Sequence, residues 1–292
     1  MERSKLGKTE LLVGNISFGC MSLSKNDDNN TLIRSAYEGG INFFDTADRY
    51  DHGWNESILG NALKDFRDDV LISTKVGHQI SGDGSQWVWK PTKDHILAAA
   101  DQSLNRLQTD RIDLYQLHGG TLEDPMDEII EAFEILQQAG KIRYYGISSI
   151  RPNVIREYVR RSSIASVMMQ YSLADRRPEE ECFGLLKDNE IGLLARGTLA
   201  KGVLIDKPPA EMLGYSESEV AKLQDELKKS GDALSASIHF VLGNPAVTTA
   251  VVGIRTQKQL DEILKAYHTP PVKSEIDRIA KILEPKLYEQ HR

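Results

Sequence analysis

The sequence alternates eight times between a short apolar segment and an amphipathic segment, and this alternation limits the possible folds more than any other feature. Most of the apolar segments are hydrophobic on both faces, as in parallel strands that are covered on both sides. Such βα alternation forms an open doubly wound sheet or a closed barrel. Eight units favour an α/β fold of the (β/α)8 TIM barrel type. The expected strands are 16–19, 41–44, 70–75, 112–117, 144–147, 167–170, 192–195 and 249–253.

Helical patterns separate these strands, and two further features add to the barrel. Residues 3–13 predict an N-terminal β-hairpin, because Gly7 and Lys8 lie between two short segments. The connection after the seventh strand, 201–245, is long and carries two additional helical patterns. No break in composition occurs, so we expect one domain over 1–292. Helices are expected at 29–38, 56–66, 92–107, 125–139, 152–161, 179–189, 217–229, 232–242 and 256–266.

Charge and composition exclude several classes of protein. The formal net charge of −7 argues against broad binding to nucleic-acid phosphates. The two cysteines, Cys20 and Cys182, have no CxxC spacing, which excludes a zinc ribbon or a disulfide scaffold. No apolar run has the length of a signal peptide or a membrane span. We therefore expect a cytoplasmic protein that acts on a small molecule, with no nucleic-acid or membrane partner, and a monomer as the default state.

Polar side chains follow the predicted strands at their carboxyl ends, where barrel enzymes hold their active sites. Burying so many polar groups in one mouth requires mutual pairing or a polar ligand. In chain order these residues are Asp45, Lys75, His118, Ser148, Ser149, Gln170, Arg196 and Arg255.

The residue types at this mouth narrow the chemistry. We place only one histidine there, His118, and no HxH or HExxH motif occurs, so no metal site is expected. A glycosidase needs two carboxylates, and only Asp45 is well placed. Two options stay open. Lys75 could form a Schiff base. Alternatively, Lys75 could lower the pKa of Tyr50, so that Tyr50 donates a proton to a carbonyl oxygen as a hydride arrives.

At these residues the sequence resembles the aldo-keto reductase family, most closely a bacterial subgroup. The segments that carry the resemblance occur in the family's order, and the match extends from the hairpin to about residue 266. They are GINFFDTADRY at 40–50, STKVG at 73–77, DLYQLH at 113–118 and GKIRYYGIS at 140–148. The resemblance implies a barrel that binds NADP(H) across its mouth without a Rossmann domain, and no GxGxxG motif is present.

The resemblance also implies roles for individual residues. Tyr50 would be the proton donor, Lys75 would lower its pKa, Asp45 would pair with Lys75, and His118 would orient the carbonyl. Arg255 would bind the 2′-phosphate of NADP(H). Arg196 stands where the family commonly stacks an aromatic ring on the nicotinamide. Other cofactor contacts are implied for Gly19, Cys20, Met21, Asp45, Ser148, Ser149, Gln170, Gly197, Thr198, Leu199, Lys201, Gly253 and Gln259.

The implied activity is NADPH-dependent reduction of aldehydes and ketones to alcohols. The substrate would contact Tyr50, His118, Trp54 and Trp87, and the last of these is expected in a Gly/Ser-rich loop at 81–89. Cys20 fits a small buried hydrophobe better than a redox group. The alternative function is a non-catalytic or very slow NADP(H)-binding sensor or regulatory subunit with the same fold.

Overall fold

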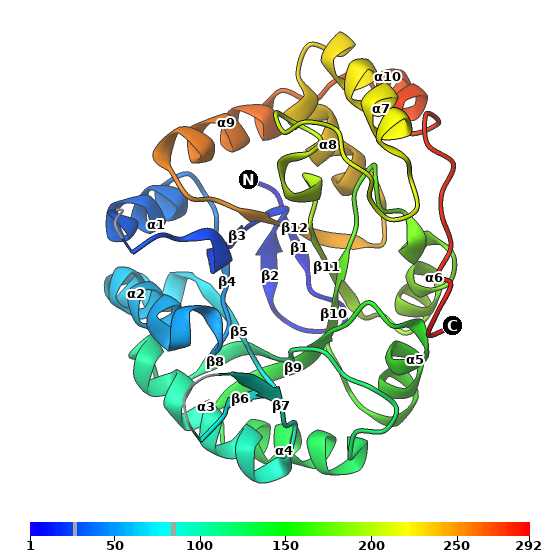
Figure 1. Ribbon diagram of the computed structural model, residues 1–292. Helices are drawn as coiled ribbons and strands as arrows, with labels where there is room; N and C mark the ends of the chain where they lie inside the picture. The colour runs from blue at the N-terminus through cyan, green and yellow to red at the C-terminus, as the bar shows by residue number, and fades with distance from the viewer. Residues whose placement is uncertain (26–27, 83–85) are drawn as a thin grey trace.

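Eight parallel strands close into a barrel, and helices surround it (Figure 1). This computed structural model describes residues 1–25, 28–82 and 86–292. The predicted (β/α)8 barrel is confirmed. Around the barrel the strands are β3 (Ile16–Gly19), β4 (Phe43–Asp45), β5 (Leu71–Val76), β8 (Ile112–Leu117), β9 (Ile142–Ser148), β10 (Ser166–Gln170), β11 (Gly192–Arg196) and β12 (Val247–Gly253).

Each barrel strand leads into a helix of the outer ring, so that the apolar stripe of the helix covers the strands. The predicted ring helices are present, with shifts of a few residues at their ends. The ring consists of α1 (Asn29–Glu38), α2 (Trp54–Leu63), α3 (Lys93–Leu107), α4 (Met126–Gln138), α5 (Pro152–Arg161), α6 (Cys182–Asp188), α8 (Ala233–Leu242) and α9 (Gln257–His268).

The N-terminal hairpin closes the end of the barrel opposite the polar mouth. Its strands, β1 (Arg3–Lys5) and β2 (Leu12–Gly14), are antiparallel, as the sequence predicted. Leu6, Leu11 and Val13 pack on inward-facing residues of the barrel, including Phe43 and Leu114. In Figure 1 the hairpin lies inside the ring of strands. Only the opposite end is therefore free to bind a ligand.

The long connection after β11 holds two helices, but only one of them is additional to the ring. α8 packs against β12 and α9 and occupies the seventh ring position. α7 (Glu217–Lys229) lies outside the ring next to α10 (Lys273–Ile279), which the sequence analysis did not predict. The two outer helices share a separate apolar cluster with residues of the loops after β10 and β11.

A second hairpin stands at the mouth, where the sequence suggested a loop. β6 (His78–Ile80) pairs with β7 (Trp87–Trp89) in an antiparallel register. Trp89 lies against Gly77, where an added Cβ would come within 2.5 Å of its ring, and its indole N–H donates to Asp124 (2.8 Å). Trp87 and Trp89 therefore lie on a strand, which corrects the expectation of a loop; residues 83–85 of that loop lie outside the described residues.

No helix in the described ranges combines the length and the apolar character that a membrane crossing requires.

Candidate active site

Lys75 lies at the centre of the mouth, buried and paired. Its Nζ is 2.6 Å from Asp45 Oδ2 and donates to the backbone carbonyl of Thr46 at 2.6 Å. β4 and β5 are adjacent strands, so their carboxyl ends bring the two side chains together. Burial lowers the pKa of Lys75, but Asp45 and Tyr50 together raise it by more than burial lowers it. The net pKa is therefore above its ordinary value. Lys75 is therefore a charged ammonium, which argues against the Schiff-base alternative, because that chemistry needs a free amine.

Tyr50 and His118 lie beside this ion pair. Lys75 Nζ is 5.2 Å from the centre of the Tyr50 ring, and the Tyr50 and His118 rings are 5.8 Å apart in an edge-to-face arrangement. His118 is fixed where the chain leaves β8, because its N–H donates to the carbonyl of Val76 (2.7 Å). The structure thus brings together all four residues that the sequence analysis expected to react.

The backbone beyond Tyr50 is strained. Asp51, His52 and Gly53 have φ values of 47°, 57° and 84°, in the left-handed region that residues other than glycine rarely adopt. Asn55, at the start of α2, donates to the carbonyl of Cys20 (2.9 Å) and accepts from Thr46 Oγ1 (2.8 Å). These contacts tie the loop that carries Tyr50 to the ends of β3 and β4.

His118 is held in its neutral form. Burial, together with the nearby Lys75, His78, Arg49 and Arg196, lowers the pKa of His118 to about 2. A neutral imidazole carries one N–H donor and one acceptor nitrogen, so it can donate a hydrogen bond to a carbonyl oxygen without carrying a charge.

The mouth holds a second histidine, which corrects the expectation of only one. His78, the first residue of β6, lies 5.8 Å from His118 between ring centres and 4.9 Å from Trp89. Its Nε2 accepts a hydrogen bond from Arg49 Nη1 at 3.1 Å. The sequence analysis missed both Arg49 and His78. The sequence offered one signal for His78, namely that it follows the strand-end residue Lys75 by only three positions. Its pairing with Arg49 could not be predicted, because it depends on the β6–β7 hairpin.

Among the described residues, no group of three or more His, Cys, Asp or Glu side chains is placed to hold a metal ion.

The other side of the mouth is formed by β9, β10 and β11, and its polar groups are open. Ser148, Gln170 and Arg196 stand at the ends of these strands, and Gln170 and Arg196 are direct neighbours in the register. Within the described residues, none of these three side chains hydrogen-bonds to the protein. Thr198 is buried and its Oγ1 also has no partner there. Polar groups without a partner are available to hydrogen-bond a polar ligand that binds at the mouth.

The segment after Arg196 turns tightly. Gly197 has a φ of 73°, and Ala200 and Lys201 also have positive φ values. Leu199 is partly buried, whereas Gly197 and Lys201 are exposed. Ser149, after β9, is buried, and its Oγ accepts from the N–H of Arg151 (3.2 Å).

The remaining expected cofactor residues lie at the ends of β3 and β12. Gly19 and Gly253 are partners in the register of these strands, and a Cβ on Gly253 would lie 2.9 Å from Ser22 Oγ. Cys20 is fully buried, and burial raises the pKa of its thiol well above the usual range, so its side chain is an inert apolar group. Met21, by contrast, is 68% exposed.

Arg255 lies just before α9 and is exposed. Its backbone N–H donates to Gln259 Oε1 at 3.0 Å, and Thr256 caps the helix by accepting from the N–H of Gln259 (3.2 Å). The Arg255 guanidinium forms no ion pair with any part of the chain that the structure describes. Lys258 is the second residue of α9, and its Nζ is 3.8 Å from Glu262 Oε1.

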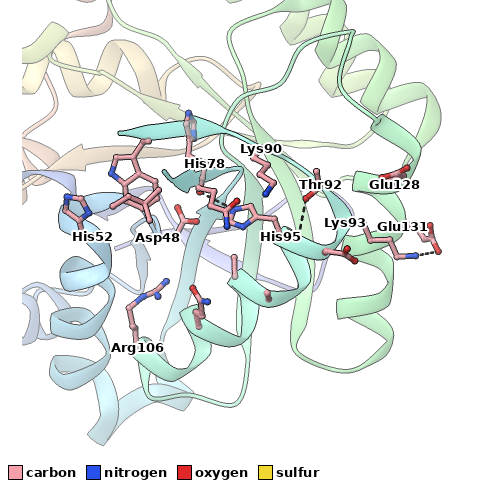
Figure 2. A pocket seen from close by; sticks show the side chains of 17 residues that line it. Asp48, His52, His78, Lys90, Thr92, Lys93, His95, Arg106, Glu128 and Glu131 are labelled. Atoms are coloured by element: carbon pink, nitrogen blue, oxygen red, sulfur yellow. Dashed lines mark hydrogen bonds and ion pairs between the residues drawn. The ribbon is translucent and has the colours of Figure 1, made fainter. Parts of the chain in front are cut away.

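A hollow of about 1060 Å³ opens on the flank of the molecule, between the β6–β7 hairpin and α3 (Figure 2). Asp48, His52, His78, Trp87 and Arg106 are among the residues that line it, whereas Tyr50, Lys75 and His118 are not. Trp54, at the start of α2, lies instead under Lys25 Nζ, which is 5.7 Å from the centre of its ring. The two tryptophans that were expected to contact substrate are therefore not both part of one hollow.

The chain belongs to the aldo/keto reductase family, whose model matches residues 11–284. It is 42% identical to the uncharacterized oxidoreductase YqkF of Bacillus subtilis, and the match covers 100% of both chains. It is 32% identical over 200 residues to the aldo-keto reductase yakc [NADP(+)] of Schizosaccharomyces pombe, covering 65% of this chain and 59% of that one.

A solved structure with the same architecture is that of aldo-keto reductase AKR11C1 from Bacillus halodurans. Its holo form has a TM-score of 0.95 and 43% identity, and its apo form a TM-score of 0.87 and 42% identity. Both comparisons cover 100% of this chain and 99% of the other. The protein is thus an oxidoreductase of this family that acts on carbonyl compounds.

Proposed function

We propose that the protein reduces aldehydes and ketones to alcohols with NADPH, and that Tyr50 donates the proton. The observation that carries this proposal is that the buried Lys75 ammonium lies beside both Asp45 and Tyr50, with the neutral His118 edge-to-face with the Tyr50 ring. When bound, NADPH supplies the hydride. The protein must then supply a proton at the carbonyl oxygen, which Tyr50 does.

Lys75 supports this proton transfer electrostatically. As the proton leaves Tyr50, the phenolate that forms is stabilised by the ammonium of Lys75. Asp45 holds the ammonium in place and keeps it charged despite its burial. His118 donates a hydrogen bond to the same carbonyl oxygen, which places the carbonyl against the Tyr50 hydroxyl.

The open side of the mouth fits a nicotinamide cofactor. A carboxamide offers both donors and acceptors, and Ser148 and Gln170 provide complementary groups that are free within the described residues. Ser149 stands beside them. Arg196 has a planar guanidinium that can stack on a ring, and it is partly buried at the end of β11. Backbone at Gly197, Thr198, Leu199 and Lys201 would pass along the pyrophosphate.

The far end of the cofactor would lie over β3, β12 and the start of α9. Gly19, Cys20 and Met21 would contact it from β3, with the Cys20 contact made by backbone. Gly253 and Gln259 would contact the adenosine. Arg255 would bind the 2′-phosphate with its exposed guanidinium. It stands next to the N-terminus of α9, and the positive end of that helix dipole also attracts an anion. NADP(H) is also the cofactor that the name of the Schizosaccharomyces pombe relative gives for that protein.

Trp54 and Trp87 would form walls for the rest of the substrate. The Trp87 ring lies 5.5 Å from that of His52, on the side of the mouth that holds the β6–β7 hairpin. Both residues are partly buried, so each has a face that a ligand can cover.

The test follows NADPH absorbance with a panel of reactive aldehydes, for the native protein and for Tyr50→Phe. We expect turnover by the native protein and a loss of about 100- to 10,000-fold in kcat for the variant, with NADPH still bound. Tight NADPH binding with no turnover of any aldehyde would contradict the proposal and favour the sensor function. Equal turnover by the two proteins would remove Tyr50 from the mechanism.

A further inference from the structure

Among the residues that the structure describes at the mouth, Arg49 is a cation to which the proposed mechanism and cofactor site give no function. Arg49 directly precedes Tyr50 in the chain and is half-buried. Its guanidinium lies close enough to His118 to contribute to lowering the pKa of that imidazole. Arg49 is therefore within electrostatic reach of the place where the carbonyl would react.

We propose that Arg49, positioned by His78, binds an oxyanion on the carbonyl substrate, so that the enzyme prefers aldehydes and ketones that carry a carboxylate or a phosphate. This inference rests on the proposed function, because it names the substrate class of the same site.

The first support is that Arg49 has no ion-pair partner among the described residues. Within the described residues it forms no ion pair, whereas Lys75 is paired with Asp45 at 2.6 Å. The carboxyl group next to it in the chain, Asp48, accepts a hydrogen bond from the backbone N–H of Arg49 but forms no ion pair with its guanidinium. Burial and the nearby Glu56 raise the pKa of Asp48 to about 7 and outweigh the effect of Arg49, which lowers it, so this carboxyl is only partly ionised near neutral pH. A half-buried arginine without a counter-charge is costly unless a ligand supplies one.

The second support is that Arg49 is held in position by a neutral partner. His78 Nε2 accepts from Arg49 Nη1 at 3.1 Å, and burial together with Arg49 lowers the pKa of His78 to about 4. His78 itself is held by the Trp89 ring at 4.9 Å, and its backbone carbonyl lies 3.1 Å from His95 Nε2. His78 is thus a positioning residue: it uses one guanidinium N–H and leaves the charge and the other donors free.

The chemistry of the free donors selects the ligand. A guanidinium presents five N–H donors in a planar fork that matches two oxygens of a carboxylate or a phosphate. The ring of His78, which holds Arg49, is 5.8 Å from that of His118. Since Arg49 Nη1 is 3.1 Å from His78 Nε2, the guanidinium and His118 lie next to the same ring. An oxyanion bound by Arg49 would then lie a few bonds from a carbonyl held by His118.

The test compares kcat/KM for matched pairs of substrates that differ in one charged group. 4-Oxobutanoate and its methyl ester form one pair, and glyceraldehyde 3-phosphate and glyceraldehyde form the other, so the two pairs distinguish a carboxylate from a phosphate. We expect the native enzyme to prefer the charged member of at least one pair. Arg49→Met is expected to reduce that preference about 10- to 100-fold, as loss of hydrogen bonds to a charged group does.

Two more variants sharpen the test. Arg49→Lys keeps the charge but loses the fork, so it should retain part of the preference. His78→Leu should reduce the preference in the same direction and by a smaller factor. The matched control is Arg160→Met on α5, where a 70%-exposed arginine forms a surface pair with Glu157 and should not affect the preference.

The outcomes separate this inference from the proposed function. Equal kcat/KM for both members of both pairs in the native enzyme would overturn the oxyanion site while leaving the reductase intact. A preference that Arg49→Met and Arg49→Lys both leave unchanged would also overturn it. Absence of turnover with every carbonyl compound would contradict the proposed function itself.

Discussion

The two sides of the mouth differ in how far the protein has already satisfied its polar groups. On the side of β4 and β5, Asp45, Lys75, Thr46 and Asn55 are bonded to one another or to nearby backbone. On the side of β9 to β11, Ser148, Gln170, Arg196 and Thr198 have no side-chain partner within the described part of the chain. The paired side is organised before any ligand arrives, while the open side keeps its groups free for one.

This difference matches two different tasks. Stabilising a developing charge works best with groups that are already oriented, because no reorganisation is then needed during the reaction. Binding an extended cofactor needs groups whose hydrogen bonds are still available. Substitutions on the paired side should therefore affect stability and turnover, and those on the open side should affect mainly cofactor affinity.

Asp45→Asn should show the largest effect on stability. The substitution leaves Lys75 buried without its counter-charge, which costs about 3–5 kcal/mol in the free energy of unfolding. Turnover should fall as well, because the ammonium is no longer held beside Tyr50. Urea unfolding measures the first effect and NADPH oxidation the second.

The matched control is Asp68→Asn, which breaks an exposed ion pair with Arg111 (2.6 Å). That change should cost no more than about 1 kcal/mol. Equal losses from the two substitutions would mean that the buried pair contributes no more than a surface pair.

At the adenosine end of the proposed cofactor site, beyond the open side, Arg255→Met should weaken NADPH binding about 10- to 100-fold and leave NADH binding nearly unchanged, because only NADPH carries the 2′-phosphate. Fluorescence titration with both cofactors measures the ratio. Lys258→Met, in the first turn of the helix that follows Arg255, is the control. Its side chain is 84% exposed and lies near Glu262, so the change should affect the ratio far less. A similar loss of affinity for both cofactors would contradict the role of Arg255.

The neutral state of His118 predicts how stability depends on pH. The unfolded imidazole has a pKa near 6.5, whereas the folded one has a pKa of about 2. Between these values the unfolded chain binds a proton that the folded chain does not, so stability falls as the pH falls below 6.5.

Between pH 7 and pH 5, the free energy of unfolding should therefore fall by about 1–2 kcal/mol less in His118→Gln than in the native protein. Urea unfolding at the two pH values measures the difference. His268→Gln, at the exposed end of α9, is the control and should follow the native curve. Parallel curves for the His118→Gln and native proteins would show that His118 is not buried in its neutral form.

The smallest effects are expected from substituting two glutamines, one on the paired side of the mouth and one on the open side. Gln116 is buried and donates to Ser73 Oγ at 2.8 Å, whereas Gln170 has no such bond within the described residues. Gln116→Met should lower the free energy of unfolding by about 1–2 kcal/mol without changing the Kd for NADPH. Gln170→Met should leave stability within about 0.5 kcal/mol and raise that Kd about fivefold. The reverse pattern would contradict the division of the mouth.

The sequence was sufficient to predict the barrel and to place at one end of it the residues that we expect to react, because both depend on local patterns. Buried parallel strands are apolar on both faces, and the strand ends all meet at one end of a barrel. Asp45, Lys75 and His118 could therefore be placed together without knowing any contact. The resemblance to the family then named the role of Tyr50, and the structure brings Tyr50 beside Lys75.

The β6–β7 hairpin and its contacts could not be predicted in the same way. The strands of this hairpin are short, and what holds it is the packing of Trp89 on Gly77 and its bond to Asp124, which are tertiary contacts. His78 reaches the mouth only because this hairpin folds over it. α10 was missed for a similar reason, since its seven residues depend on packing against α7 and α8.

The central claim, that the paired side controls chemistry and the cofactor contacts outside it control NADPH binding, is tested most directly by a double-mutant cycle. NADPH affinity and the single-turnover rate at saturating NADPH would be measured for Tyr50→Phe, Arg255→Met and the double variant. We predict that the effects on each quantity add within about 0.5 kcal/mol, with Tyr50→Phe changing the rate and Arg255→Met changing the affinity. A larger coupling energy, or a loss of NADPH affinity in Tyr50→Phe as great as that in Arg255→Met, would contradict the claim.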